Sequence, residues 1–459
     1  STQPEVIYTT PACLRTWFHV GSSNTVALAA SYRDDSEQIV LPPQTLENAA
    51  ALGFGEHEQG LRSLAGSIIR QEVFAVNSDG SLASHPFQVT QNSYRLRRLQ
   101  PSYSGLDACF MYFMGESITY NYEQQADDPR ISHDLTFDVD GSGNILQNCS
   151  VTYGRRSSIP TESTAQQEIL VSAQTYRYIN IERPDRHELG IPVETQAYEI
   201  VGLVPGATGV FEWDSLRQNI AAAIATPLAY DQDFSSSGIQ ARLITWERTL
   251  YWNDTLDAPL PLGSVGIQTL LHHTESACFT TTFVNQNFGT RIDTNQLGTE
   301  ARYKQQDGYW WQPSDTYHYQ AASGFFQLAR LERLDGGVTT VTYDPYALTI
   351  IEIQDALGNY IRGEIDYHLL APHRITDPND NIAEVLYDPL GVVIVSSIQG
   401  QVLDTAGNPQ TYGHDRLSTY TPRPNPTFAD VLANPAFHLQ NSAQFVFYEL
   451  DAWTAAASP

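Results

Sequence analysis

A short acidic loop is the clearest place in this sequence where side chains could do chemistry. Asp138 and Asp140 alternate, and Asn144 follows after a Gly-Ser-Gly run. Alternating oxygen-bearing side chains open the loops that wrap calcium, a hard cation that prefers oxygen ligands. The glutamate that closes an EF-hand loop is missing, because the twelfth position counted from Asp138 is Cys149. Calcium binding by Asp138, Asp140 and Asn144 is one hypothesis for this loop, and a structural turn that holds no metal or cofactor is the interpretation that we favour.

Histidines and acids elsewhere offer further candidates. Glu364, Asp366 and His368 alternate and would share one face of a strand, where an imidazole and two carboxylates could ligate a metal. An ordinary solvated strand face is the alternative. His272 and His273 are adjacent, so on a strand they would point to opposite faces. The sequence has no Gly-x-Ser-x-Gly elbow and no HExxH motif, and we therefore predict no catalytic residue.

Clustered aromatic residues raise a third kind of chemistry. Tyr309, Trp310 and Trp311 are consecutive, and rings of this kind could stack on sugars. The 52 acidic residues offer many carboxylate pairs for glycoside hydrolysis, although the required separation is a three-dimensional quantity. Packing in a core is the other interpretation of these rings.

The charge balance limits the partners of the chain. Acidic residues number 52 and basic residues 25 among 459, which gives a formal net charge of −27. Such a surface repels nucleic acid and anionic lipid, so we expect neither as a partner. No run of 18 apolar residues occurs, and we predict no membrane insertion by this chain. The first residues show neither a Met nor a signal peptide, which is typical of a processed product or of part of a longer protein.

Cysteine usage points away from metal and redox chemistry. The four cysteines are far apart and form no CxxC pair, which argues against a zinc knuckle or a redox motif; they are Cys13, Cys109, Cys149 and Cys278. Two disulfides and four free thiols both remain open.

The elements that must position these side chains are predicted to be mainly short strands. The 25 Tyr residues suit a pleated, half-buried surface, and 30 Gly with 25 Pro punctuate the chain at short intervals. Apolar and polar residues alternate in part over 87–96 and 131–139, and residues 145–153 return as a strand after the acidic loop. We also expect a strand at 25–32.

Helices are predicted at only one or two places. Residues 214–226 are rich in helix formers, and Leu216, Ile220 and Ile224 lie four apart on one face. This spacing predicts a surface helix packed against a sheet. A second, short helix is expected at 428–437.

The last third of the chain contains a repeat. Residues 341–344 (Val-Thr-Tyr-Asp) recur as 385–388 (Val-Leu-Tyr-Asp), 44 residues on. Between them, the Asp-led turn 355–359 recurs as 377–381, 22 residues on. The unit is therefore a strand, an Asp-led turn and a strand, and such a unit must stack on neighbours because it cannot bury its own apolar face.

Several blocks in a fixed order resemble those of a known family. They lie at residues 15–22 (Arg-Thr-Trp-Phe-His-Val-Gly-Ser), 93–101, 116–123, 128–133 and 310–314. Together they resemble the middle and C-terminal region of the B component of Tc insecticidal toxin complexes, in the Rhs/YD-repeat family. Nothing resembles that family's N-terminal part, its β-propeller or its aspartyl self-cleavage site, so docking, self-cleavage and toxicity are not carried over.

The resemblance implies an all-β fold, a curved antiparallel sheet of Rhs/YD-repeat strands with one or two short surface helices. It implies a structural shell or cocoon segment that helps enclose a toxic cargo, in a secreted, extracellular virulence factor. We expect residues 1–335 to form the B-component-like region, 336–400 the repeats, and 401–459 an extended segment with a final strand, all in one continuous β structure. Expected partners are companion Tc or Rhs toxin components, or further copies joined through strand edges.

A second hypothesis comes from a different class of protein. The chain could be an extracellular β-rich protein that binds or degrades polysaccharide in an acidic, aromatic-lined groove. An enzyme is the less favoured of the two interpretations.

Overall fold

The structure is a computed structural model, and it describes residues 11–32, 38–122, 127–155, 164–235, 237–407, 409–414, 416–423 and 426–449. The chain divides into two compact units. The first unit comprises Ser1–Leu250, Pro261–Ser264 and Thr274–Gln312. The second comprises Tyr251–Leu260, Val265–His273 and Pro313–Pro459.

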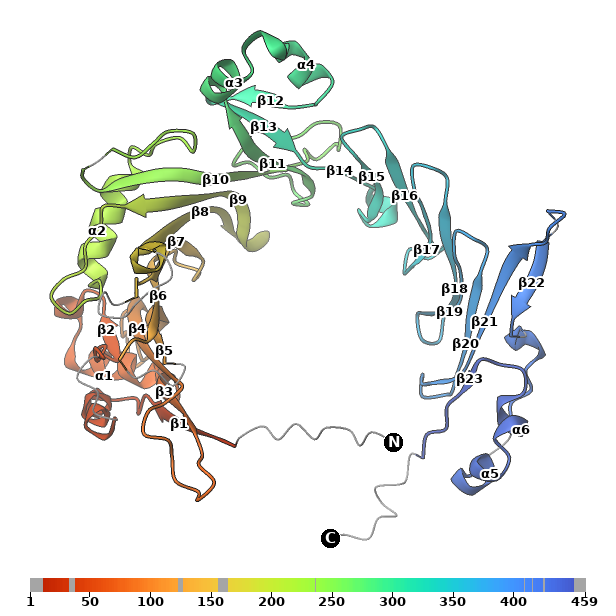
Figure 1. The fold of residues 1–459 in the computed structure, drawn as a ribbon, viewed down its shortest axis with the longest axis horizontal. Coiled ribbons are helices and arrows are strands. Elements are labelled where there is room, and N and C mark those ends of the chain that lie inside the picture. The colour runs from red at the N-terminus through yellow and green to blue at the C-terminus, as the bar shows by residue number, and fades with distance from the viewer. Residues whose placement is uncertain are drawn as a thin grey trace. The chain divides into compact units, whose positions relative to one another are not determined.

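The first sheet has 13 strands that follow one another almost in chain order (Figure 1). Its spatial order is β1-β3-β4-β5-β6-β7-β8-β9-β10-β11-β13-β12, and β2 pairs in parallel with β4. The strands are β1 (Ala12–Phe18), β2 (Gln44–Leu46), β3 (Ile68–Ala75), β4 (Gln88–Gln100), β5 (Cys109–Asn121), β6 (Arg130–Val139), β7 (Ile145–Thr152), β8 (Leu170–Arg183), β9 (Arg186–Val201), β10 (Gln240–Tyr251), β11 (Leu271–Thr280), β12 (Lys304–Gln306) and β13 (Tyr309–Pro313).

One face of this sheet carries the main hydrophobic core. Residues opposite one another in antiparallel strands point to the same face, so the register defines rows of side chains across the sheet. One such row crosses from β4 to β10 and is buried throughout: Gln91, Ile118, His133, Val151, Val171, Ile200 and Ala241. The alternation seen in the sequence therefore reflects one buried face and one more open face.

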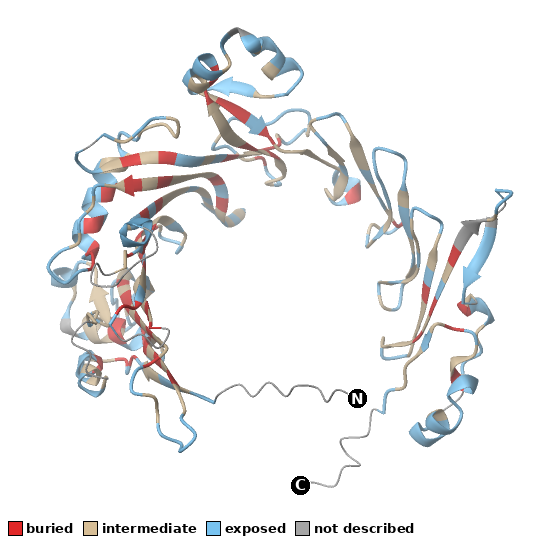
Figure 2. Ribbon diagram, in the orientation of Figure 1, coloured by how far each residue is buried: buried red, intermediate tan, exposed pale blue. Residues whose placement is uncertain are grey.

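The helix α2 (Trp213–Ile224) covers this core. Leu216 and Ile220 are buried, and Ile224 packs against the same cluster. The predicted surface helix is confirmed, and Figure 2 shows its buried residues along one side. Full burial of an aliphatic side chain stabilises by roughly 1.5–3 kcal/mol, so packing rather than intrinsic propensity holds this helix in place.

The strand predicted at residues 25–32 is wrong. The 3-10 helix η1 spans Ser23–Ser31. The Thr25 hydroxyl accepts the backbone N–H of Val20 at 3.1 Å and donates to the carbonyl of Ser22 at 2.9 Å. Such local side-chain bonds to the backbone compete with strand pairing and favour a turn.

The second sheet has 10 strands, in the order β14-β15-β16-β17-β18-β19-β20-β21-β22, with β23 paired to β21. Its strands are β14 (Thr316–Tyr319), β15 (Leu328–Glu332), β16 (Val338–Tyr343), β17 (Ile350–Gln354), β18 (Tyr360–Asp366), β19 (Ala371–Thr376), β20 (Ile382–Tyr387), β21 (Val393–Leu403), β22 (Pro409–Gly413) and β23 (Gln444–Phe445). Every described pairing between neighbours in it is antiparallel. The expected all-β, antiparallel fold is thus confirmed.

Helices outside α2 are short. They are α1 (Phe54–Ser63), α3 (Thr281–Asn287), α4 (Thr294–Thr299), α5 (Phe428–Ala433) and α6 (Pro435–Leu439), with 3-10 turns between. The helix expected at 428–437 is split into α5 and α6 by Asn434, which lies outside the helical region with φ −137°. Among the described helices, none has the length and apolar character needed to cross a bilayer.

Candidate functional site

A five-residue turn joins β6 to β7 and holds two of the three predicted calcium ligands. The Asp140 carboxylate accepts, at Oδ1, the backbone N–H groups of Ser142 and Asn144, both at 2.9 Å. Its Oδ2 accepts the side-chain amides of Asn144 at 2.9 Å and Asn180 at 2.6 Å. Burial alone would raise the pKa of Asp140, but these hydrogen bonds outweigh burial and lower the pKa. Four N–H donors thus already satisfy this carboxylate.

The same turn recurs in the second sheet. At Asp355, Asp377 and Asp388, Oδ1 accepts the backbone N–H groups two and four residues further on. The fourth residue of each turn has a positive φ, at Gly143, Gly358, Asp380 and Gly391. The loop at Asp140 is therefore one more copy of the turn that joins the repeats. This supports the interpretation of the loop as a structural turn. Calcium binding by the loop stays the alternative hypothesis.

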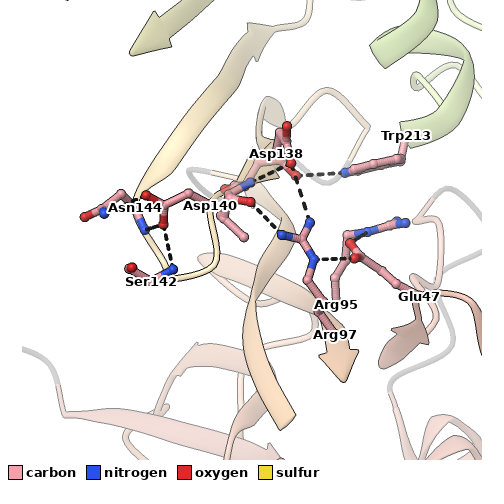
Figure 3. A network of polar contacts seen from close by, with 10 residues as sticks. Glu47, Arg95, Arg97, Asp138, Asp140, Ser142, Asn144 and Trp213 are labelled. Carbon is pink, nitrogen blue, oxygen red and sulfur yellow. Dashed lines mark hydrogen bonds and ion pairs between the residues drawn. The ribbon is translucent and has the colours of Figure 1, made fainter. Parts of the chain in front are cut away.

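Asp138 lies apart from the turn, in a polar network around β4 (Figure 3). Its Oδ1 accepts the backbone N–H of Val139 at 2.9 Å and lies 3.5 Å from Nη2 of Arg97. Arg97 also donates to Oε2 of Glu47 at 2.7 Å and to the carbonyl of Val139 at 2.6 Å. In this fold, Asp138 is therefore the ion-pair partner of Arg97.

A cavity of about 310 Å³ opens beside this network. Residues of β4, β6 and α2, and residues at the end of β2, line it. The side chains that carry charge or aromatic character are Glu47, Arg95, Arg97, Phe137, Asp138, Trp213 and Arg217. Three guanidinium groups in one cavity are unexpected in so acidic a chain, and an arrangement of this kind can hold an oxyanion.

The trio Glu364, Asp366 and His368 does not share a strand face. Strand β18 ends at Asp366, whose Oδ1 accepts the backbone N–H of His368 at 2.8 Å, so His368 lies in the turn beyond the strand. Glu364 pairs with Nη1 of Arg374 at 2.6 Å. This prediction was wrong because the strand stops two residues short of His368. In the ranges that the structure describes, no group of three or more His, Cys, Asp or Glu side chains could hold a metal ion.

His272 and His273 do not point to opposite faces either. Their Nδ1 atoms are 2.7 Å apart and their ring centroids 4.6 Å apart. The ring of Trp252 lies 4.1 Å from that of His272. A shared hydrogen bond, in which one Nδ1 donates and the other accepts, overrides the alternation of an ideal strand.

Two predicted sugar-stacking rings are inaccessible. Trp310 is 4% exposed and Trp311 is 0% exposed. Trp311 packs edge-on against Trp246 with 5.0 Å between ring centroids, and the Arg248 guanidinium lies 3.8 Å from its ring. These rings are core residues, which removes the main support for a carbohydrate groove.

The four cysteines are free thiols. Cys149 is buried in the core, and burial raises its pKa to about 12, so its thiol stays protonated at neutral pH. The disulfide alternative left open by the sequence is therefore excluded in this structure.

The second sheet presents two chemically different faces, which the sequence did not reveal. One face carries a row of apolar side chains from β16 to β21: Val341, Ile353, Ile361, Ile375, Ala383 and Ile398. Neighbours in this row oppose one another directly except at β18 and β19, where Ile375 opposes Gly363, which shares the face of Ile361. The four isoleucines are 39%, 49%, 40% and 58% exposed, in chain order. Figure 2 shows these strands largely in the colours of intermediate and exposed residues. We call this set the apolar row.

The opposite face carries a ladder of ion pairs. Glu352 pairs with Arg362, and Glu364 pairs with Arg374. Arg374 lies 3.6 Å from the Glu384 carboxylate, which also pairs with Arg416 at 2.7 Å. We call this set the charged ladder. The charges of the ladder pair with one another within the chain, although the buried Nε of Arg374 has no hydrogen-bond acceptor among the described residues, whereas the isoleucines of the apolar row stay exposed.

Comparisons with known proteins agree with this architecture. Residues 59–191 match the family model described as the insecticide toxin TcdB middle/C-terminal region. The chain is similar to a crystal structure of TcdB2-TccC3, with a TM-score of 0.73 and 20% identity over 98% of this chain and 22% of that one. It is also similar to the Photorhabdus luminescens Tc holotoxin pore structure, with a TM-score of 0.71 and 20% identity over 96% of this chain and 21% of that one.

These comparisons confirm the predicted resemblance to the middle and C-terminal region of the Tc toxin B component. The chain spans about a fifth of the length of the solved chains that it matches. A search of curated proteins gives no match.

Proposed function

We propose that this chain is a structural segment of the shell of a Tc-type toxin complex, where it helps to enclose a toxic cargo. The observation that carries the proposal is the second sheet, whose charged ladder is ion-paired within the chain while its apolar row stays exposed. A sheet with one apolar face needs another layer to cover that face. A shell wall receives such a layer from its contents or from a companion chain.

The exposed row is large enough to matter energetically. The isoleucines at 353, 361, 375 and 398 each retain between 39% and 58% exposure. Full burial of such a side chain is worth roughly 1.5–3 kcal/mol, so covering the exposed part of all four would stabilise by about 3–6 kcal/mol. A covering layer would thus add a sizeable fraction of the stability of an ordinary domain.

Strand edges offer the second means of assembly. Among the described strands, β14 pairs only with β15, and β22 pairs only with β21, although the carbonyl of Tyr317 on β14 already accepts Nε1 of Trp252 at 2.6 Å. An unpaired edge presents free backbone N–H and carbonyl groups to another chain. We infer that companion shell strands, or further copies of this chain, pair at these edges.

The related solved structures suggest which partners to test. They include complexes of TcdB2 with TccC3 and a Tc holotoxin pore. By analogy, the partners of this chain would be companion Tc components, and its location would be extracellular, as part of a secreted virulence factor. The Asp-led turns of the second sheet would then be Rhs/YD-type repeats.

Co-expression with the companion chains of its native source tests the proposal. We expect one large particle by light scattering, and a cargo segment that resists protease inside it. Ile375→Glu should prevent this assembly by placing a charge on the apolar row. Thr376→Glu is the matched control, because the next residue of the same strand points to the face of the charged ladder. A compact monomer that ignores every companion chain would refute the proposal.

A further inference from the structure

We propose that the cavity of Figure 3 is a carboxylate-binding site, an inference independent of the shell function. The cavity holds three guanidinium groups, from Arg95, Arg97 and Arg217, against two carboxylates, from Glu47 and Asp138. Its local charge is therefore positive by one, on a chain whose formal net charge is −27. The electrostatic potential in the cavity is therefore opposite in sign to that of the chain as a whole, and it attracts anions to the cavity.

Arg97 makes the shortest contacts with the two carboxylates. Arg97 binds Glu47 at 2.7 Å and the carbonyl of Val139 at 2.6 Å, and it lies 3.5 Å from Asp138. Arg95 is paired only loosely, with its Nε 3.5 Å from Oε1 of Glu47, and Arg217 has no carboxylate partner among the described residues. An anion bound in the cavity would supply hydrogen-bond acceptors for these two side chains.

Of these two residues, Arg95 gives the stronger evidence for a binding site. Its side chain is 16% exposed, yet no hydrogen bond from it occurs among the described residues, and its buried Nε has no acceptor. The nearest carboxylate oxygen, Oε1 of Glu47, is 3.5 Å from Nε. A largely buried donor group without an acceptor is destabilising, and a bound oxyanion would supply the acceptor that this group lacks.

The neighbourhood holds this guanidinium in place. It lies 3.6 Å from the centroid of the Trp213 ring, and Nε1 of Trp213 is itself fixed by the carbonyl of Thr136 at 3.1 Å. On β5, a Cβ at Gly115 would lie 2.6 Å from Cγ of Arg95, so a glycine leaves room for the arginine stem. Arg95 is therefore positioned before any ligand arrives, which lowers the entropic cost of binding.

Arg217 supplies a second donor, from the exposed face of α2. It follows Trp213 by one helical turn, and its guanidinium lies 5.4 Å from the same ring. Its side chain is exposed and makes no hydrogen bond with the described residues. Arg217 can thus close over a ligand that Arg95 holds from below.

The charge and size of the cavity favour a carboxylate over other anions. A single uncompensated positive charge matches a monoanion, and the planar guanidinium group pairs with a carboxylate in two parallel hydrogen bonds. Glu47 and Asp138 at the same cavity would repel a phosphate dianion. A volume of about 310 Å³ accommodates an acidic side chain or a short carboxylic acid.

NMR of the full chain, labelled with ¹⁵N-arginine, tests the inference. Propionate should shift the Nε–H resonance of Arg95 saturably, and propionamide, its neutral counterpart, should not. Arg95→Lys identifies the resonance by removing it. Equal shifts with acid and amide, no shift with either, or saturable binding of inorganic phosphate in place of propionate would overturn the proposal.

Peptide probes distinguish the source of the carboxylate. An acetyl-Gly-Glu-Gly-amide peptide that binds at least about tenfold more tightly than propionate indicates an acidic protein segment. Equal affinities indicate a small free acid, and both results support a carboxylate site. The same peptide with Gln in place of Glu must lose binding, since retained binding would contradict recognition of the carboxylate.

Two variants separate binding from structure. Arg217→Gln, on the exposed face of α2, should weaken propionate about fivefold, the effect of one exposed charge pair. Asp138→Asn should tighten it roughly threefold at low salt, because it removes a repelling charge but keeps an acceptor for Val139. Arg242→Gln is the matched control, since Arg242 is paired with Glu199 at 2.5 Å elsewhere on the sheet. Unchanged affinity in both cavity variants would refute the site.

Discussion

Replacing Glu384 by alanine should loosen the second sheet far more than replacing Glu364, although both carboxylates pair with Arg374. The Glu384 side chain is 9% exposed. It accepts Nε of Arg416 at 2.7 Å and the backbone N–H of Leu417 at 2.9 Å, and it lies 3.6 Å from Arg374. Glu364 is 57% exposed, and its single partner among the described residues is Arg374, at 2.6 Å.

The two costs follow from burial. Removal of Glu384 leaves the N–H of Leu417 and Nε of Arg416 without their acceptor and takes away a charge beside Arg374, and breaking a buried pair in this way costs about 3 kcal/mol or slightly more. Removal of Glu364 breaks an exposed pair, which is worth about 0–1 kcal/mol. Water can hydrate Arg374 in the second variant, but it reaches the site of Glu384 poorly.

Hydrogen exchange with mass spectrometry measures this contrast locally, which suits a chain of two units. A loss of 3 kcal/mol corresponds to roughly 150-fold faster exchange of peptides from β20 and β21. Glu364→Ala should change their exchange less than about fivefold. Equal acceleration in the two variants would refute the reasoning from burial.

Other perturbations probe the first sheet. Ile220→Ala should lower the free energy of unfolding by about 2–5 kcal/mol in urea titrations, because this side chain of α2 is fully buried in the core of the first sheet. Gly115→Ala should lower the melting temperature and displace Arg95, since the new Cβ would meet the arginine stem at 2.6 Å. Burial lowers the pKa of His19, although a hydrogen bond from its Nε2 to Oε1 of Gln44 opposes this, so the unfolded state binds the proton more readily. Stability should therefore fall as pH drops below about 6.5, and less so in His19→Asn. Millimolar calcium should leave the melting temperature unchanged, because four N–H donors already occupy the Asp140 carboxylate; a clear rise would revive the calcium hypothesis.

Strong local patterns predicted the elements that depend on them. The helix expected at 214–226 is α2, and the strands expected at 131–139 and 145–153 are β6 and β7. Each of these segments has a clear period and a defined turn or cap beside it. The strand expected at 25–32 lacked such a period, and side-chain bonds of Thr25 to the backbone decided its conformation instead.

Features that depend on long-range register could not be predicted. The apolar row needs the pairing of β16 to β21, since each of its strands contributes only one or two of its residues. The cavity at Arg95 needs β4, β6 and α2 together, and those elements are far apart in the sequence. A partial signal was present, because Arg95 and Arg97 alternate on one strand and therefore share a face.

The family resemblance supplied what local patterns could not. It indicated an antiparallel β architecture, and the family match over residues 59–191 and the solved structures agree with it. The Asp-led turns then explain how one short motif generates successive hairpins. They also explain why the acidic loop at Asp140 resembled a calcium site, since turn and metal loop use the same oxygen-bearing residues.

Hydroxyl-radical footprinting of the apolar row tests the central claim most directly. Ile353, Ile361, Ile375 and Ile398 would be labelled in the isolated chain and again after assembly with its companion chains. The shell account predicts that all four are labelled in the isolated chain and protected in the assembly, while Glu352 and Glu364 on the opposite face change little. Labelling of the four isoleucines that stays equally high after assembly would contradict it.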